Sequence, residues 1–398
     1  MIRHFVVAAA SFALCAGMIS LSQAQEPKES TEGLDMQAAR ANMMSARGSK
    51  VAYTKKWDLS GLPKYQPKQK VSGIIRMWGS NYITDGFLGG YWEAAFRKFH
   101  PDVKFDFHMK TTLAAVPSLI FGVSDLGIGR KITFAEQELF ERYTDRSPVE
   151  IEIATGSYDV PDWQPGYGVV VQKDNPLTKI TMEQLDGVFG AERAGGWEGT
   201  SWRPNWARGP EKNIRTWSQL GLTGEWADKP INVYGLTLRY HQATEISDRV
   251  LKASDKWNER LKIYANFVSK AGKLERGMNE DLAADKYGIG IVAAPTTNLT
   301  GSASQPTQKV LPVAAKDGGP YIPYTLDTLQ NRTYPLYDRI FAYADREQGQ
   351  PMNLAVLEFL RFVLSQEGQA EVMRDGKYLP LTAEVANAQL KKLEEAAK

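Results

Sequence analysis

The sequence has very little cysteine and histidine. Its 398 residues include one cysteine, Cys15, and only three histidines beyond the N-terminal segment, His100, His108 and His241. A single thiol cannot form an intramolecular disulfide or a thiolate metal cluster. None of the three histidines stands at metal-ligand spacing with another histidine. We therefore expect no metal site and no cofactor.

The sequence also lacks a charge excess and the short motifs of common enzymes. The 48 Lys and Arg residues nearly balance the 46 Asp and Glu residues, which leaves a formal net charge of +2. Nucleic-acid-binding domains usually show a strong basic excess, so we expect no nucleic-acid partner. No G-x-S-x-G elbow, P-loop or H-E-x-x-H motif occurs. We predict no catalytic residues and a protein that is not an enzyme.

The first 24 residues have the pattern of a secretory signal peptide. Arg3 and His4 form a polar start, residues 5–21 are almost wholly apolar or small, and Ser22-Gln23-Ala24 suits signal peptidase. The apolar run is interrupted and is no longer than the ~20 residues that span a bilayer, which disfavours a permanent anchor. Bulky Leu14 disfavours lipidation of Cys15. We predict cleavage near Ala24 and a cysteine-free mature protein in the periplasm, where a stray thiol is a liability.

Residues 25–69 are polar and contain Pro27, Pro63 and Pro67. A short helix at 34–47 is possible, but strands and helices do not alternate here. We interpret this stretch as a linker or loosely attached arm.

From residue 71 onward, strands and helices alternate. Expected strands of the first stretch are 71–78, 103–109, 125–129 and 149–154, and its expected helices are 87–99, 113–121 and 134–143. A Gly- and Pro-rich crossing at 156–166 leads to expected strands 167–172, 231–235 and 287–293, helices 181–188 and 242–252, and a final helix 352–374. This rhythm predicts an α/β fold with mixed, mostly parallel sheets and helices on both faces. We assign 70–158 and 293–398 to lobe 1 and 159–292 to lobe 2.

Three segments carry a resemblance to a known family. Residues 169–190 combine a strand, an Asn-Pro-Leu turn and a helix that ends in Phe189-Gly190; residues 334–339 precede an apolar helix and the segment 365–369; residues 125–130 read Asp-Leu-Gly-Ile-Gly-Arg. In order and spacing they resemble the phosphate-binding proteins of ABC importers, within the type II periplasmic-binding superfamily. The resemblance extends from about Gly73 to Leu381. It implies a two-lobed fold that closes over a ligand.

The resemblance also implies where the ligand binds. The family holds an oxyanion with backbone N–H groups and hydroxyls at helix N-termini, to which an arginine can add a bidentate contact. The residues that match these loops, and that we predict to bind the ligand, are Gly79, Ser80, Asn81, Thr111, Thr112, Arg130, Arg239, His241, Gln242 and Thr244. Ser, Asn and Thr are also common turn and cap residues, and the two arginines could instead form surface ion pairs.

The ligand loops depart from the family pattern. Gln242-Ala243 replaces the usual Ser-Gly, the second loop has lost its glycines, and Arg130 stands where some phosphate binders have an Asp. Loss of glycine limits close backbone approach to a phosphate, and glutamine changes the set of donors. The resemblance therefore leaves open whether the ligand is phosphate, another small anion or a larger polar solute.

Tryptophan is abundant, with ten in the chain. Five of them, Trp197, Trp202, Trp206, Trp217 and Trp226, lie within 30 residues. They could form an aromatic platform for a ligand or partner. We favour a structural role, in which the large rings order an irregular loop.

Together these observations predict an exported, monomeric solute-binding protein. It would capture phosphate or another small anion or polar solute and present it to an ABC permease in the inner membrane. One alternative is a degenerate binding protein that acts as a sensor or envelope partner. The other is an exported phosphatase or hydrolase.

Overall fold

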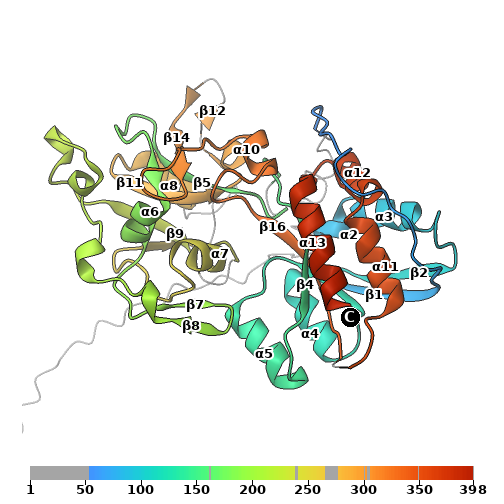
Figure 1. The fold of residues 1–398 in the computed structure, drawn as a ribbon. Helices are drawn as coiled ribbons and strands as arrows, with labels where there is room; N and C mark the ends of the chain where they lie inside the picture. The colour runs from blue at the N-terminus through green and yellow to red at the C-terminus, as the bar shows by residue number, and fades with distance from the viewer. Residues whose placement is uncertain are drawn as a thin grey trace, which may run out of the picture. The chain divides into compact units, whose positions relative to one another are not determined.

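The computed structural model describes residues 53–160, 163–237, 241–264, 277–299, 301–302, 305–347 and 349–397. The predicted signal peptide and residues 25–52 of the predicted arm lie outside these ranges. Among the described residues, no helix is both long and apolar enough to cross a membrane. Two five-stranded sheets organise the fold, and each is the centre of one lobe (Figure 1).

The sheet of lobe 1 has the strand order β2-β1-β3-β16-β4. Its strands are β1 (Gly73–Gly79), β2 (Val103–His108), β3 (Leu126–Gly129), β4 (Val149–Thr155) and β16 (Arg339–Ala344). Of these strands, β16 alone runs antiparallel to its neighbours.

Helices cover both faces of this sheet. On one face lie α3 (Leu88–Phe96), α11 (Leu354–Val363), α12 (Gln366–Asp375) and α13 (Ala383–Ala396), packed in the core that includes Ile75 and Met77. On the other face, α4 (Ala115–Ile120) and α5 (Phe134–Thr144) pack with Phe341 and Tyr343 of β16.

The sheet of lobe 2 has the order β10-β9-β11-β5-β14. Its strands are β5 (Tyr167–Gln172), β9 (Asn232–Leu236), β10 (Lys262–Tyr264), β11 (Gly288–Ala293) and β14 (Gln308–Leu311). α6 (Met182–Phe189) and α7 (His241–Val250) pack on one face, and α8 (Met278–Ala284) packs on the other. β5 is antiparallel to β11 and β14. Two sheets with helices on both faces confirm the predicted α/β fold class.

Shorter elements complete the described chain. They are α2 (Tyr82–Asp85), α9 (Pro295–Asn298), α10 (Leu326–Gln330), β6 (Ile180–Thr181), β7 (Gly196–Glu198), β8 (Ser201–Arg203), β12 (Gly301–Ser302), β13 (Gln305–Pro306), β15 (Val313–Ala314) and the 3₁₀ turns η1 (Thr112–Ala114), η2 (Pro204–Trp206), η3 (Pro210–Lys212), η4 (Trp217–Leu220) and η5 (Gly224–Trp226).

The lobes are joined by two crossings that lie side by side. The first runs from β4 to β5, at the predicted Gly- and Pro-rich segment, and the second leads into β16. Gly156 N donates to Asp338 O (2.8 Å), and Tyr167 N donates to Leu336 O (2.9 Å). A Cβ on Gly156 would lie 1.9 Å from the Gln164 carbonyl oxygen, so this close approach requires glycine.

The chain returns to lobe 1 later than we expected. β14 pairs with β5, so the sheet of lobe 2 extends to residue 311, beyond the predicted limit at 292. The physical reason is a nonlocal edge pairing that local periodicity does not reveal. The lobe boundaries as a whole remain a prediction.

The predicted loose arm is wrong for its last part, residues 53–65. Leu59, Leu62 and Tyr65 are buried in the core of lobe 1. The Tyr65 hydroxyl donates to Glu358 Oε2 (2.8 Å), and Pro63 O accepts from Gln366 N (2.9 Å). A few apolar side chains in a polar stretch are sufficient to attach it, because they are buried in a core that includes helices from the far end of the chain.

Two expected helices are also divided in the structure. The helix expected at 352–374 is broken into α11 and α12, because Ser365 starts a new helix by accepting Gly368 N (3.3 Å). The stretch expected at 113–121 consists of η1 followed by α4. Pro117 lies in the first turn of α4, where a missing backbone N–H leaves no helical bond unmade.

Candidate functional site

The predicted ligand loops of lobe 1 meet at one edge of its sheet. β1, β2 and β3 are parallel, with Trp78 opposite His108 and Gly79 opposite Ile128, so the loops that follow them emerge together. A Cβ on Gly129, just before Arg130, would lie 3.6 Å from the Thr112 Cβ. The structure thus brings the loops of Gly79, Thr112 and Arg130 together.

The loop at Gly79 and Ser80 is bound tightly to β3. Gly79 has a φ of 129°, and a Cβ there would lie 2.0 Å from Ile128 O, so only glycine fits. Ser80 N donates to the same carbonyl oxygen (2.7 Å). The Ser80 hydroxyl is buried near the Tyr378 hydroxyl but forms no hydrogen bond of good geometry. The N–H of Ser80 is therefore already bonded, and the hydroxyl is the donor that this residue can offer.

Asn81 and Thr111 have local partners. Asn81 Nδ2 donates to Asp85 Oδ2, one turn further along α2. Thr111 Oγ1 accepts from Leu113 N (3.4 Å) and caps η1. Both side chains thus act as cap or turn residues, and their role in ligand binding remains a prediction.

Arg130 is bound by a carboxylate of its own lobe. Its Nη1 and Nη2 donate to Glu136 Oε2 (2.8 Å) and Oε1 (3.1 Å), and its side chain is 6% exposed. Burial lowers the pKa of Arg130, but the hydrogen bonds and charge of Glu136 outweigh burial and raise it. Glu136 also accepts from Thr133 N (2.8 Å) in the capping box that starts α5. Of the three guanidinium nitrogens of Arg130, Nε is buried and has no hydrogen-bond partner among the described residues.

The predicted residues of lobe 2 lie at the start of α7. His241 Nε2 is 3.2 Å from the Tyr167 hydroxyl and 3.8 Å from Asp338 Oδ2, beside the crossings. Gln242 Nε2 donates to Ile291 O (2.7 Å), which directs this side chain into lobe 2. Thr244 Oγ1 donates to His241 O (2.8 Å). Arg239 lies outside the described residues.

Two acidic residues of α7 were missed by the sequence reasoning. Glu245 and Asp248 follow His241 at spacings of four and seven, and so continue its face of the helix towards lobe 1. Burial, followed by the charge of Asp338, raises the pKa of Glu245 to about 7. Burial raises the pKa of Asp248 to about 6, although Lys131 and other cations oppose this shift. Their helical spacing from His241 could be read in the sequence, but the segment that matches the family ends at Thr244.

These carboxylates line a pocket of about 170 Å³ between the lobes. Lobe 1 contributes Lys131, Ile132, Phe134, Gln137 and Arg339, and lobe 2 contributes Trp197, Gly199, Glu245, Asp248, Arg249 and Ala253. The cations of lobe 1 have carboxylate partners in the same lobe: Lys131 pairs with Glu150 (2.5 Å) and Arg339 with Glu152 (3.3 Å). The pocket therefore combines aromatic walls with charges of both signs.

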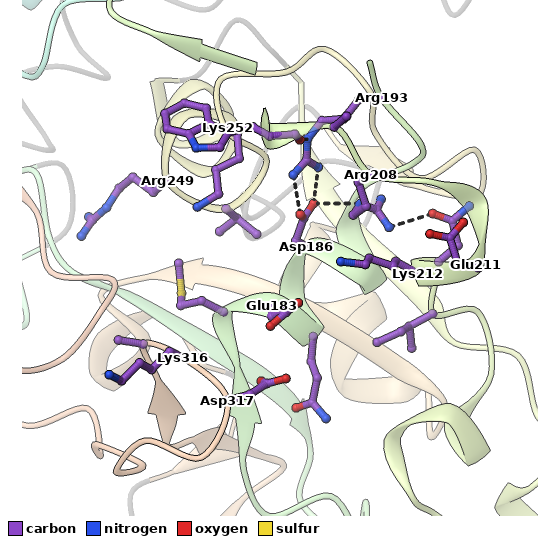
Figure 2. A pocket seen from close by; sticks show the side chains of 18 of the residues that line it. Glu183, Asp186, Arg193, Arg208, Glu211, Lys212, Arg249, Lys252, Lys316 and Asp317 are labelled. Carbon is purple, nitrogen blue, oxygen red and sulfur yellow. Dashed lines mark hydrogen bonds and ion pairs between the residues drawn. The ribbon is translucent and has the colours of Figure 1, made fainter. Parts of the chain in front are cut away.

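A larger pocket, of about 710 Å³, lies in lobe 2 alone (Figure 2). Asp186 of α6 binds both Nη atoms of Arg193 (2.6 Å each), and Arg208 Nε is 3.5 Å from Asp186 Oδ1. Burial lowers the pKa of Arg208 despite the opposing charge of Asp186. Asp186 binds both guanidinium groups, which indicates a structural tie, and one carboxylate against two guanidinium groups leaves one net positive charge. Among the described residues, no group of three or more His, Cys, Asp and Glu side chains is arranged to hold a metal.

The chain is similar to known binding proteins. Residues 65–367 match a family model described as the PBP superfamily domain. Phosphate-binding proteins PstS from two strains of Pseudomonas aeruginosa are each 27% identical over 334 residues, which is 83% of this chain and 90% of theirs. A solved possible phosphate binding protein from Planctomyces limnophilus is 19% identical, with a TM-score of 0.44 and coverage of 83% of this chain and 100% of its own. PstS from Borrelia burgdorferi is 15% identical, with a TM-score of 0.48 and coverage of 78% of this chain and 100% of its own.

Proposed function

Because this chain belongs to the PBP superfamily, we propose that it is an exported binding protein that holds phosphate or another small anion between its lobes and delivers it to an ABC-type importer. The observation that carries the proposal is the 27% identity to a phosphate-binding protein across 83% of this chain and 90% of the relative. A match of that extent includes both lobes and both crossings. The proposal is supported by the three loops of lobe 1, those of Gly79, Thr112 and Arg130, which emerge from one edge of its sheet.

Few donors at this edge are free to bind an anion. Arg130 Nε is buried without a hydrogen-bond partner among the described residues, and the buried Ser80 hydroxyl has the Tyr378 hydroxyl nearby without a hydrogen bond of good geometry. The His241 ring lies beside the crossings. Contacts to one solute from both lobes would favour closure and trap it. Gln242 is bonded within lobe 2 and Asn81 within α2, so the donor set differs from that of the family pattern. For this reason the proposal includes small anions other than phosphate.

The prediction that the chain is not an enzyme agrees with its curated relatives, which are named for binding phosphate. No observation favours the sensor or hydrolase alternatives. The periplasmic location, the signal peptide, the permease partner and the monomeric state are parts of the proposal. Mass spectrometry of the exported protein tests the first two, and a mature N-terminus at Gln25 is the expected result.

A calorimetric titration tests the anion site directly. The exported chain is unfolded to remove bound solute, refolded, and titrated with inorganic phosphate at neutral pH. We expect one-to-one binding that weakens about 10- to 100-fold in Ser80→Ala, because a hydrogen bond to a charged ligand is lost. Ser218→Ala, an exposed serine of lobe 2, is the matched control. An absence of heat with phosphate, sulfate and simple phosphonates would overturn the proposal.

A further inference from the structure

The Trp-rich segment of lobe 2 contains a short β-hairpin made of β7 and β8. Trp197 pairs with Trp202 across the two strands, and their rings meet edge to face with centroids 5.1 Å apart. Gly199 forms the turn with a φ of 57°. Trp202 is 45% exposed, so the hairpin does not belong to the core of its own lobe. Its position requires another explanation.

The base of the hairpin is fixed to lobe 2. Arg193 and Arg208, which flank it, exchange two backbone hydrogen bonds of 2.9 Å. Both guanidinium groups reach Asp186 of α6, as Figure 2 shows. Trp197 N also donates to Lys252 O (2.9 Å), just beyond the end of α7. The hairpin is therefore fixed at its base, and only its tip extends from lobe 2.

The tip of the hairpin contacts α5 of lobe 1. Trp197 packs on Phe134, with ring centroids 4.7 Å apart. A Cβ on Gly199 would lie 3.3 Å from Gln137 Oε1, so the turn lies directly against this side chain. Hydrogen bonds from Ser147 and then Gln137 lower the pKa of Glu141, and the nearby Thr200 side chain at the hairpin turn adds a smaller lowering.

The contacted residues form one stripe along α5. Phe134, Gln137 and Glu141 are spaced by three and four, which places them on the same side of the helix. Phe140, in contrast, is fully buried in the core of lobe 1. Figure 1 shows β7 and β8 beside α5, far along the chain from it. The hairpin of one lobe thus rests on the outer face of a helix of the other.

We propose that the hairpin 196–203 is an interlobe latch, in which Trp197, Gly199 and Thr200 of lobe 2 dock on Phe134, Gln137 and Glu141 of lobe 1. Protein groups alone make this contact, so it favours closure of the lobes independently of any solute. Trp197 and Phe134 also line the interlobe pocket, so the latch forms one of its walls. Its effect on solute affinity rests on the proposed function, whereas its effect on closure does not.

Small-angle X-ray scattering without added solute tests the closure. Trp197→Ala in lobe 2 and Phe134→Ala in lobe 1 should each increase the radius of gyration, because each removes the same aromatic contact. The double variant should add little to either single variant. Tyr143→Ala is the matched control, since Tyr143 is an exposed aromatic residue of α5 that packs on Phe121 instead. Folded variants that scatter like the parent protein would overturn the latch.

A cysteine pair keeps the test decisive if an alanine variant fails to fold. Cys15 is the only native cysteine, so Glu141→Cys with Thr200→Cys in a Cys15→Ser background provides two unique thiols. Efficient crosslinking by a short bis-maleimide without solute is expected. Failure to crosslink, while Glu141→Cys paired with Ser147→Cys reacts, would refute the contact.

Phosphate titration then measures the contribution of the latch to affinity. A contact that favours the closed form raises the apparent affinity of a solute that binds this form. Loss of one aromatic pair should weaken phosphate binding about 2- to 10-fold. If the parent protein binds no phosphate, the proposed function fails while the scattering result still judges the latch. Unchanged affinity in Trp197→Ala, together with unchanged scattering, would reject both effects of the hairpin.

Discussion

Replacing Glu136 by glutamine should strengthen phosphate binding and weaken the fold. Glu136 now holds Arg130 through two hydrogen bonds of 2.8 and 3.1 Å, so its negative charge lies at the edge where the anion is expected. Glutamine keeps one oxygen to accept from Thr133 N, which preserves the cap of α5. The substitution therefore removes a charge and releases a guanidinium group without removing the helix start.

The magnitude follows from Coulomb's law. An anion that accepts from Arg130 Nε, on the far side of the guanidinium from Glu136, would lie roughly 7 Å from that carboxylate, because each hydrogen bond separates its heavy atoms by about 3 Å. At an effective dielectric constant of about 20, this repulsion is roughly 2 kcal/mol per charge. Salt screening reduces the repulsion, so we expect affinity to rise about 10-fold. Arg130 then remains buried without its carboxylate, which should lower the free energy of unfolding by about 3–5 kcal/mol in the absence of phosphate.

Calorimetry and urea unfolding, each with and without phosphate, measure both effects. Phosphate should stabilise Glu136→Gln more than the parent protein, because ligand stabilisation grows with affinity. Glu138→Gln, two residues along α5 and without an ion pair among the described residues, should change neither quantity. An unchanged or lower affinity in Glu136→Gln would show that Arg130 does not border the anion.

Three further predictions concern stability. Tyr65→Phe should lower the free energy of unfolding in urea by about 1.5–3 kcal/mol, because buried Glu358 loses a donor, and the exposed control Tyr143→Phe should change it by less than about 0.5 kcal/mol. If Tyr65→Phe lowers the free energy of unfolding as little as the control does, residues 53–65 are loosely attached after all. The pKa of Glu245 is raised from 4.5 to about 7, so its contribution to stability is greatest below pH 4.5 and falls as the pH rises towards 7. Glu245→Gln should make stability depend less on pH between pH 5 and pH 8. If the substitution changes the urea midpoint by the same amount at pH 5 and at pH 8, the raised pKa of Glu245 is contradicted. Asp186→Asn should cost about 3–5 kcal/mol because two buried guanidinium groups lose their carboxylate, whereas exposed Glu183→Gln should be nearly neutral. Equal urea midpoints for these two variants would argue against the structural tie.

The strands were the most predictable part of the fold. The strand expected at 167–172 coincides with β5, and the one expected at 71–78 corresponds to Gly73–Gly79. Residues 167–171 are an apolar run, and residues 74–78 are apolar except for Arg76. Turn residues follow both strands, and this signal depends only on neighbours in the sequence. β14 escaped prediction because pairing with β5 stabilises it across more than 130 residues of chain.

Residues 53–65 of the predicted arm show that local sequence patterns also fail to predict nonlocal packing. Leu59, Leu62 and Tyr65 are separate apolar residues in a polar stretch, so composition indicated a linker. Tyr65 is buried because its ring meets Phe99 and Phe362, at centroid distances of 5.0 and 5.5 Å, and its hydroxyl meets Glu358. Two of these partners lie almost 300 residues away. No local pattern reports such a contact.

The ligand site was the least predictable part, since each polar side chain there can bind either a solute or the protein itself. The Thr133–Glu136 capping box could be read from the sequence. The ion pair between Glu136 and Arg130 depends on the position that the end of β3 gives to Arg130. The bond from Gln242 to Ile291 O joins segments 49 residues apart. Homology transfers a fold through apolar positions, which the sequence displays directly. It transfers a ligand only through polar atoms without other partners, and at this edge those include the Ser80 hydroxyl and Arg130 Nε. A solute that needs more donors than these must obtain them when the lobes move and bring further polar groups to the site. Because the latch favours one arrangement of the lobes, it influences which solute is bound.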